Sequence, residues 1–272
     1  MNEILKDLSV SSLVTAIETN LFEFFKLFEQ WPRAEVHDNP DMLWTITDIP
    51  FPMFNSVFRA RLSDPDAAIK AAIARCRCRN VPMMWWTGPS TQPAELGIAL
   101  EAFGFTGEEV TGMAADLRSL PRDVSVPPGL VIQRVGDIET MKKWCHVLCV
   151  GFQMPDFVGE AFLDLFRSTG FDSQSTLRHY IGCLNDEPVS ASLMFLGAGV
   201  AGIYCVATIP EARKRGIGSA TTLMPLHEAR ILGYQIGILH SSRMGVNVYH
   251  GLGFREYCKI IQYVWLNQQA GK

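Results

Sequence analysis

The hydrophobic positions along the chain recur with two periods, which predict helices and strands in alternation. Apolar residues between positions 2 and 31 recur near helical spacing, so this segment is predicted to be a helix that ends at Trp31-Pro32. Residues 41–47 alternate between apolar and polar, as a strand does. By the same reasoning we expect strands at 54–62, 82–86 and 110–117, and helices at 67–78, after the start signal Asp64-Pro65-Asp66, and at 93–103.

A proline-rich stretch separates this series of elements from a second one. Residues 120–129 contain Pro121, Pro127 and Pro128 and little apolar pattern, so we interpret them as a linker. The later segments are predicted as strands at 130–132, 177–184, 189–196, 200–208, 234–239 and a last one to 265, and as helices at 137–150, 155–168, 216–232 and 244–251. We therefore predict two domains, 1–120 and 129–272, and an α+β fold whose mixed, mostly antiparallel sheet is flanked by helices.

Two local features add to this pattern. Residues 100–105 and 250–254 each place a Gly-Phe pair after a predicted helix and before a closing strand, which hints at an internal repeat. Pro225 falls inside the predicted helix 216–232 and removes one backbone donor. We expect a kink there, or an exposed carbonyl near Thr221.

Composition narrows the class of protein. Of 272 residues, 48% are hydrophobic and 19% are charged, which suits a packed core and excludes a disordered chain. The net charge is -4 and the basic residues are dispersed, so we expect no nucleic-acid partner. No apolar run reaches membrane-spanning length and the first residues do not resemble a signal peptide, so we expect a cytoplasmic protein without a membrane partner.

The cysteines point to neither a disulfide scaffold nor a metal site. There are seven, an odd number, scattered along a chain of ordinary size. Cys76 and Cys78 are close in sequence, but no second close pair with a nearby histidine completes a zinc set. We therefore predict no bound metal.

The chemistry of the chain is concentrated in residues 206–220. There a strand ends, a basic loop follows, and Gly216 and Gly218 precede an amphipathic helix. Free amides at a helix start bind anions, and glycines allow a phosphate to approach the backbone. The segment lacks the Gly-Lys-Ser/Thr of nucleotide-triphosphate loops and the three glycines of the dinucleotide fingerprint. We expect this segment to bind a diphosphate. The alternative is an ordinary loop whose glycines serve packing, and a lone Gly-x-Gly favours that alternative.

A wider constellation resembles the GNAT superfamily of acyltransferases. It consists of Arg213-x-x-Gly216-x-Gly218 together with Tyr249-x-x-x-Gly253-Phe254, and the resemblance covers residues 129–266. Residues 55–62 and 84–89 resemble the degenerate N-terminal half of two-domain members, and that half has no Arg-x-x-Gly-x-Gly counterpart. The resemblance implies tandem halves of the acyl-CoA N-acyltransferase fold, of which only the C-terminal half binds CoA.

The resemblance also implies an activity: direct transfer of an acetyl group from acetyl-CoA to a primary amine. The pantetheine arm maps to backbone at Val206, Ala207 and Thr208, and Tyr249 maps to the general acid that reprotonates the CoA thiolate. Ser242 stands where many relatives have an asparagine that touches the cofactor. The amides that would hold the diphosphate are those of Arg213, Lys214, Arg215, Gly216, Ile217, Gly218 and Ser219.

Several alternatives remain open at this stage. Around Tyr204 and Cys205 there is no carboxylate to serve as a base, so a catalytically silent CoA-binding or protein-interaction module is a second hypothesis. His146 and His179 are candidate bases by residue type alone, and we interpret both as solvated or core histidines. Cys205 is interpreted as a buried strand thiol rather than a nucleophile. The amine acceptor and the oligomeric state are not readable from the sequence.

Overall fold

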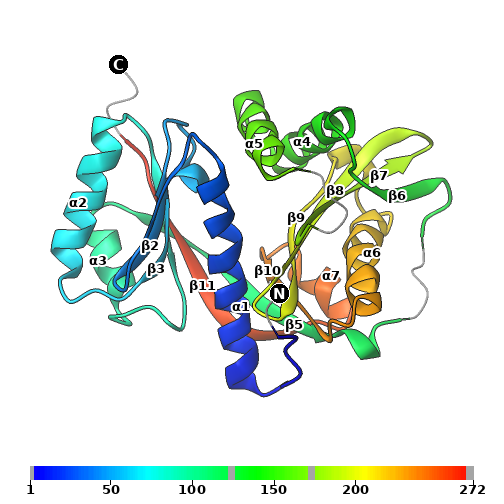
Figure 1. The fold of residues 1–272 in the computed structure, drawn as a ribbon, viewed down its shortest axis with the longest axis horizontal. Helices are drawn as coiled ribbons and strands as arrows, with labels where there is room; N and C mark the ends of the chain where they lie inside the picture. Colours follow the sequence, from blue (N-terminus) through cyan, green and yellow to red (C-terminus); the bar gives the residue numbers. More distant parts are fainter. Residues whose placement is uncertain (1–2, 122–125, 171–174, 268–272) are drawn as a thin grey trace. The chain divides into compact units, whose positions relative to one another are not determined.

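A computed structural model describes residues 3–121, 126–170 and 175–267 (Figure 1). The chain forms two compact units. The larger unit comprises Met1–Asn20 and Gly112–Tyr257, and the smaller unit comprises Leu21–Thr111 and Cys258–Lys272. Three elements run from one unit into the other: α1 (Val10–Lys26), β5 (Thr106–Asp116) and β11 (Arg255–Trp265). The N-terminal segment thus belongs to the larger unit and the C-terminal segment to the smaller one. The contiguous domains 1–120 and 129–272 stay a prediction.

The smaller unit is a short mixed sheet with two helices. Its strands are ordered β1-β2-β3-β4-β11, and the β3–β4 pair is parallel while the β1–β2, β2–β3 and β4–β11 pairs are antiparallel. The elements are β1 (Glu35–Asp38), β2 (Met42–Ile46), β3 (Ser56–Ala60), β4 (Met83–Thr87), α2 (Pro65–Cys78) and α3 (Leu96–Ala102). The start signal predicted for α2 is confirmed, because the Asp64 carboxylate accepts the Ala67 N–H at 3.0 Å and Pro65 follows it.

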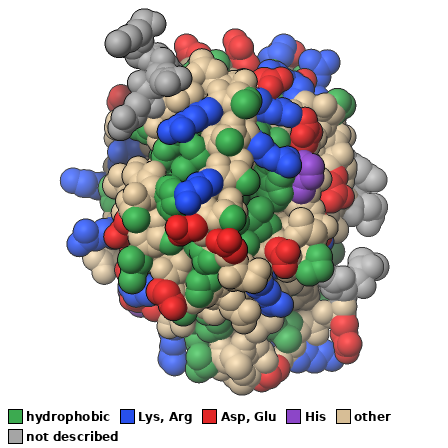
Figure 2. All heavy atoms as spheres, turned by 90° about the vertical axis from the view of Figure 1, so that its left-hand side faces the viewer, with side chains coloured by type: hydrophobic (Ala, Val, Ile, Leu, Met, Phe, Trp, Pro, Cys, Tyr) green, Lys and Arg blue, Asp and Glu red, His purple; other side chains and the backbone are tan. Residues whose placement is uncertain are grey.

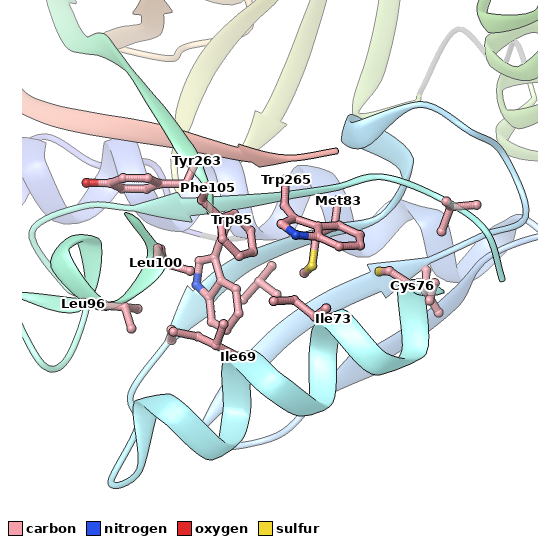
Figure 3. Close-up of a cluster of buried hydrophobic side chains, with 14 residues drawn as sticks. Ile69, Ile73, Cys76, Met83, Trp85, Leu96, Leu100, Phe105, Tyr263 and Trp265 are labelled. Carbon is pink, nitrogen blue, oxygen red and sulfur yellow. The ribbon is translucent and has the colours of Figure 1, made fainter. Parts of the chain in front are cut away.

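The core of the smaller unit lies between α2 and its strands (Figure 3). Ile69 and Ile73 of α2 pack in one cluster with Trp85 of β4 and Trp265 of β11. Each fully buried side chain of this kind contributes about 1.5–3 kcal/mol relative to an exposed one. On the side that α2 and α3 occupy, Figure 2 shows basic and acidic side chains interspersed with hydrophobic ones.

The larger unit is a mostly antiparallel sheet covered by helices on both faces. Its strands are ordered β5-β10-β9-β8-β7-β6; β6 to β9 pair antiparallel, and β9 pairs with β10 in parallel. The α+β prediction is therefore confirmed. The remaining elements are β6 (Leu130–Arg134), β7 (Leu177–Leu184), β8 (Glu187–Gly197), β9 (Val200–Thr208), β10 (Ile236–Ser241), α4 (Ile138–Phe152), α5 (Asp156–Thr169), α6 (Ile217–Ile231) and α7 (Val246–Gly251).

Neighbouring residues of β7 show which helices cover which face. The His179 ring lies 5.0 Å from that of Trp144 on α4, whereas the Tyr180 hydroxyl donates to Glu228 of α6 at 2.6 Å. Side chains alternate across a strand, so α4 and α6 cover opposite faces, as Figure 1 also shows.

The predicted N-terminal helix is wrong at both ends. Helix α1 begins only at Val10, and after Lys26 the chain tightens into a short 3-10 turn. The segment before it is held by other bonds, because the Asp7 carboxylate accepts the Ser9 N–H at 2.9 Å and the Leu5 N–H donates to Gly199. Polar capping at Asp7 and Ser9 thus replaces the first predicted turns.

Other boundaries moved less, and one strand was missed. The predicted segments 54–62, 93–103, 234–239 and 244–251 are β3, α3, β10 and α7 in the structure. Strand β1 is short, and its sequence Glu-Val-His-Asp carries little hydrophobic alternation. It forms because its backbone pairs with that of β2, and no local sequence pattern predicts this pairing.

Pro225 lies inside α6, as predicted, and its consequence is visible one turn earlier. A proline cannot donate the backbone hydrogen bond that residue 225 would otherwise give to the Thr221 carbonyl. The Ser192 hydroxyl of β8 donates to that carbonyl at 2.9 Å. The sheet therefore supplies the donor that the helix lacks.

Candidate functional site

The larger unit contains a fork between two parallel strands. Pairing of β9 with β10 ends at Ile203 and Leu239, although both strands continue. Beyond that point β9 bulges, because Cys205 has φ 54° and the β8–β9 register shifts between Ala191 and Leu193. A bulge bends a strand and interrupts its ladder. The fork follows from this bend.

The basic loop at the far end of β9 has the backbone geometry of a candidate anion site. Lys214 and Gly216 adopt left-handed backbone, with φ 60° and 76°, and Gly216 is the N-cap of α6. The N–H of Ala220 donates to the Gly216 carbonyl at 3.1 Å. The N–H groups of residues 217–219 come before this first helical hydrogen bond. They therefore have no carbonyl acceptor within the helix. With exposed Lys214 and Arg215 beside them, these amides suit a diphosphate.

The side chain of Arg213 braces the loop instead of facing solvent. Its Nε donates to the Thr208 carbonyl at 3.0 Å, and its Nη2 donates to the Gly151 carbonyl at 2.7 Å. A Cβ at Gly151 would lie 2.8 Å from the Ala207 Cβ, so only glycine fits there. Arg213 therefore ties the end of α4, the end of β9 and the start of the loop together.

The structure brings the predicted pantetheine strand to the predicted diphosphate loop. Val206 and Thr208 are half-buried and Ala207 is buried. A Cβ placed on Gly218 would lie 3.5 Å from the Thr208 Oγ1, so the first turn of α6 lies against the end of β9. An extended ligand with an anionic end could follow the strand from the loop into the fork.

Tyr249 lies on α7 and connects to the same helix start. Its ring packs edge-on against Phe254 at 6.0 Å. Burial raises the pKa of Tyr249 to about 12, and hydrogen bonding with the Thr222 hydroxyl acts in the opposite direction. Thr222 in turn donates to the Gly218 carbonyl at 2.8 Å. At neutral pH the phenol is protonated, as a proton donor must be.

Ser242 lies just beyond β10 and its side chain is exposed. Its carbonyl accepts the Gly245 N–H at 2.9 Å and the Ser241 hydroxyl at 2.8 Å, which holds the turn into α7. Its position fits the sequence-based role, and contact with the cofactor stays a prediction.

Three other residues were candidates for a base or a nucleophile, and the structure does not support a catalytic role for them. His179 is buried against Trp144, and burial lowers its pKa to about 3, so it is a neutral core histidine as interpreted. His146 is exposed on α4. Burial raises the pKa of Cys205 to about 12, which leaves it a thiol and disfavours the nucleophile hypothesis.

A polar cluster that no pattern in the sequence predicts lies at the fork. The rings of Tyr204 and His240 lie 5.9 Å apart, one on each strand, directly after the last paired residues. The Tyr204 hydroxyl donates to Asn20 Oδ1 at 2.7 Å, and Asn20 Nδ2 donates to the Gly197 carbonyl at 2.8 Å. Nothing in the local pattern links α1 to β9, so only pairing of the strand positions could have suggested Tyr204 and His240.

The smaller unit repeats one turn of this architecture. After α3 and after α7 the chain closes identically: Phe105 N–H donates to Leu100 at 3.1 Å, and Phe254 N–H donates to Tyr249 at 3.0 Å. Gly104 and Gly253, with φ 85° and 94°, precede the two phenylalanines. The echo seen in the sequence is thus a shared Schellman-type turn.

At the positions that matter, the smaller unit differs from the larger one. A buried leucine, Leu100, occupies the place in this turn that Tyr249 has in the larger unit. Strand β3 leads into α2, whose first turn has the Asp64 carboxylate on its amides and Pro65 in place of one donor. A negative cap disfavours an anionic ligand at this helix start. That this half does not bind CoA stays a prediction.

Among the described residues, no group of His, Cys, Asp or Glu side chains is arranged to hold a metal ion. Nor does any helix in the described part of the chain combine the length and the apolar character needed to cross a bilayer.

Comparison with solved structures gives the fold. A GCN5-related N-acetyltransferase from Kribbella flavida aligns with TM-score 0.69 at 13% identity, over 92% of this chain and 95% of that one. A GCN5-related N-acetyltransferase from Sphaerobacter thermophilus aligns with TM-score 0.58 at 14% identity, over 94% and 91%. A tandem GNAT protein from the clavulanic acid biosynthesis pathway aligns with TM-score 0.58 at 12% identity, over 97% and 96%.

The chain therefore has the acyl-CoA N-acyltransferase fold of the GNAT proteins, and its likeness to a tandem GNAT protein extends over nearly the full length of both chains. No family model and no curated protein sequence matches it.

Proposed function

We propose that the chain is an N-acetyltransferase that moves an acetyl group from acetyl-CoA to a primary amine by direct transfer. The observation that carries this proposal is the uncapped start of α6, where left-handed Lys214 and Gly216 lie beside the end of β9. In a GNAT fold, an anion site of this form next to the point where β9 and β10 separate suits the diphosphate of CoA.

The donor would bind mainly through backbone. Its diphosphate would lie on the amides between Arg213 and Ser219, and its pantetheine arm would run along Thr208, Ala207 and Val206. This order places the thioester deepest, at the fork. Exposed Lys214 and Arg215 would add charge, while the Arg213 guanidinium would hold the loop in shape.

In the proposed reaction the amine nitrogen attacks the thioester carbonyl carbon, the C–S bond breaks, and the sulfur takes a proton from Tyr249. The surplus proton on the amine nitrogen leaves to water, and water returns a proton to Tyr249. A phenol kept protonated by burial can give that proton without competing ionisation at neutral pH. The amine acceptor and a cytoplasmic location, both expected from the sequence, belong to the same proposal.

A second candidate is a catalytically silent CoA-binding or protein-interaction module. One observation favours it: the smaller unit keeps its fold with a capped α2 and with Leu100 in place of a tyrosine. The smaller unit thus combines a related turn with residues that do not suit the proposed transfer chemistry. Tight acetyl-CoA binding without turnover of any amine would favour this candidate.

The test is calorimetric titration of acetyl-CoA into the wild-type protein and into Gly218→Trp. We expect binding near one equivalent in the wild type and its loss in the variant, because an indole would fill the approach to the first turn of α6. Gly136→Trp is the matched control, since a Cβ there meets nothing within 4 Å and the residue is exposed. A folded wild-type protein that binds no acetyl-CoA would exclude the acetyltransferase.

A further inference from the structure

The smaller unit contains a cavity between α2 and its sheet that the proposed function does not use. The cavity has a volume of about 250 Å³, and Met42, Trp44, Val57 and Met83 line it from the strands. These four residues belong to the hydrophobic cluster of the unit. A cavity of this kind offers a ligand mostly apolar contact, so the few polar groups at its edge decide which ligand fits.

The sequence of α2 explains why the cavity exists. Ala68, Ala71, Ala72 and Arg75 have the spacing of one helical stripe, and all four line the cavity. On the neighbouring stripe Ile73 reaches the buried cluster (Figure 3). Because alanine side chains are short, the helix leaves room beside this contact. Arg75 follows the alanines on the same stripe and brings a charge to the cavity.

An aromatic ring holds Arg75 at the cavity. The guanidinium carbon of Arg75 lies 4.9 Å from the centre of the Trp44 ring, on which the His37 ring also stacks at 4.2 Å. A contact with the face of a ring positions a guanidinium and leaves the N–H groups in its plane available. Among the described residues, none accepts a hydrogen bond from the Arg75 guanidinium or forms an ion pair with it.

The charge of Arg75 is not matched at the cavity. Glu35 borders a neighbouring hollow together with Arg75. However, Glu35 is already paired with Arg79, whose hydrogen bond holds the pKa of that carboxyl below its usual range. In the described part of the chain no Asp or Glu lines the cavity itself. An arginine in this situation favours an anion, and its planar fork suits a carboxylate.

The rest of the cavity suits an apolar body. Two polar residues of its lining are bonded within the protein: Asn55 Nδ2 donates to the Ile49 carbonyl at 2.9 Å, and the Ser56 hydroxyl donates to the Met53 carbonyl at 3.0 Å. A dry cavity of about 150 Å³ in a protein core can hold benzene. A volume of about 250 Å³ therefore has room for a ring with a short chain.

We infer that this cavity binds a small carboxylate with an apolar body, of the arylalkanoate or medium-chain fatty acid class, and that Arg75 binds its carboxylate group. The apolar body would lie between the alanines of α2 and the methionines Met42 and Met83. The inference goes beyond the proposed function and does not depend on it, because every residue that carries it belongs to the smaller unit.

The experiment is calorimetric titration of 3-phenylpropionate and of octanoate into the full-length wild type and into Arg75→Met. We expect binding near one equivalent in the wild type and an affinity roughly tenfold lower in the variant, because a charge-assisted hydrogen bond is lost. The alcohol 3-phenylpropan-1-ol has the same apolar body without the charge, so it should bind the wild type roughly tenfold more weakly than the acid does.

The helix offers matched controls for both parts of the site. Arg77→Met removes a guanidinium that lies 5.6 Å from the centre of the Trp265 ring and does not line the cavity. Ala72→Leu places a longer side chain in the cavity, and Ala67→Leu makes the same change at an exposed residue outside the lining. Ala72→Leu should abolish binding, whereas both control variants should keep the wild-type affinity.

The outcomes decide the inference. A folded wild type that binds neither acid would overturn it, and so would an Arg75→Met variant with wild-type affinity or equal losses in Arg75→Met and Arg77→Met. Gly218→Trp separates this cavity from the proposed donor site. If that variant lost 3-phenylpropionate binding, the acid would bind at the start of α6 and the inference would be wrong. Loss of acetyl-CoA binding alone in Gly218→Trp agrees with both proposals.

Discussion

Gly216 and Tyr249 show how single residues shape the proposed donor site. Gly216 supplies a left-handed turn at the start of α6, and Tyr249 supplies a phenol whose pKa burial raises, so that it is protonated at neutral pH. Neither effect needs a formal charge on a side chain. The charged residue in the motif, Arg213, donates hydrogen bonds to two backbone carbonyls.

A substitution at Gly216 should cost stability and binding together. Gly216→Ala places a Cβ on backbone with φ 76°, which costs about 1–2 kcal/mol. Urea unfolding should show this loss, and acetyl-CoA binding should weaken because the amides shift. Gly218→Ala is the control for stability: its Cβ would make only an ordinary 3.5 Å contact with Thr208, so an equal loss there would refute the backbone argument.

Tyr249→Phe should lower kcat by roughly 10²-fold while acetyl-CoA affinity stays within about twofold. The phenol in the folded protein is protonated below a pKa of about 12, so the donor form is present at neutral pH and is lost only as pH rises toward that value. The wild-type kcat should therefore show no alkaline loss from this group up to about pH 10. If Tyr249→Phe turns over normally, another group reprotonates the thiolate.

At the level of elements, two contacts tie helices to the sheet. Arg213 joins β9 to α4, and Ser192 of β8 completes the hydrogen bonding of α6 where Pro225 interrupts it. The bonds from Arg213 to the Gly151 carbonyl and from Ser192 to the Thr221 carbonyl each join residues far apart in the sequence. They position the start of α6 and its body, respectively.

Removal of the Ser192 hydroxyl should destabilise the protein. Ser192→Ala leaves the buried Thr221 carbonyl without a donor, at a cost of about 1–3 kcal/mol measured by denaturant unfolding. Pro225→Ala restores a backbone N–H one turn later. In the double variant we therefore expect much of the loss to be recovered; simple additivity of the two changes would contradict this account.

Arg213 should matter for binding through shape. Arg213→Lys cannot reach two carbonyls with a planar fork, so the loop should loosen and acetyl-CoA affinity should fall roughly tenfold by calorimetry. The acetyl-CoA affinity of this variant is compared with that of Lys214→Met, which removes an exposed charge beside the same amides. A larger effect at Lys214 than at Arg213 would mean that charge dominates.

For the whole molecule, the two units have related turns and different chemistry. The turns after α3 and α7 match, yet the smaller unit carries Leu100 at the tyrosine position and a capped α2. We therefore expect one acetyl-CoA per chain in calorimetry. Asp64→Ala should leave the affinity of that single site unchanged, and a stoichiometry near two would show that the smaller unit binds the donor as well.

The sequence by itself determined much of the larger unit. The α+β class and the order of most elements followed from hydrophobic periodicity, and the glycine loop at residues 213–218 predicted an anion site by local rules. These features are local: a glycine before a helix and an alternating strand have the same meaning in any fold. The Gly-Phe echo was readable for the same reason, because each copy is a complete turn.

Only the tertiary structure decided the rest. Helix α1 starts late because capping at Asp7 competes with its first turns, and β1 exists because β2 pairs with it. The assignment of residues 1–20 and 112–257 to one compact unit and the cluster of Asn20, Tyr204 and His240 depend on contacts between segments far apart in the chain. Such contacts have no period and no local signal, since the residues share neither an element nor a spacing until the sheet brings them together.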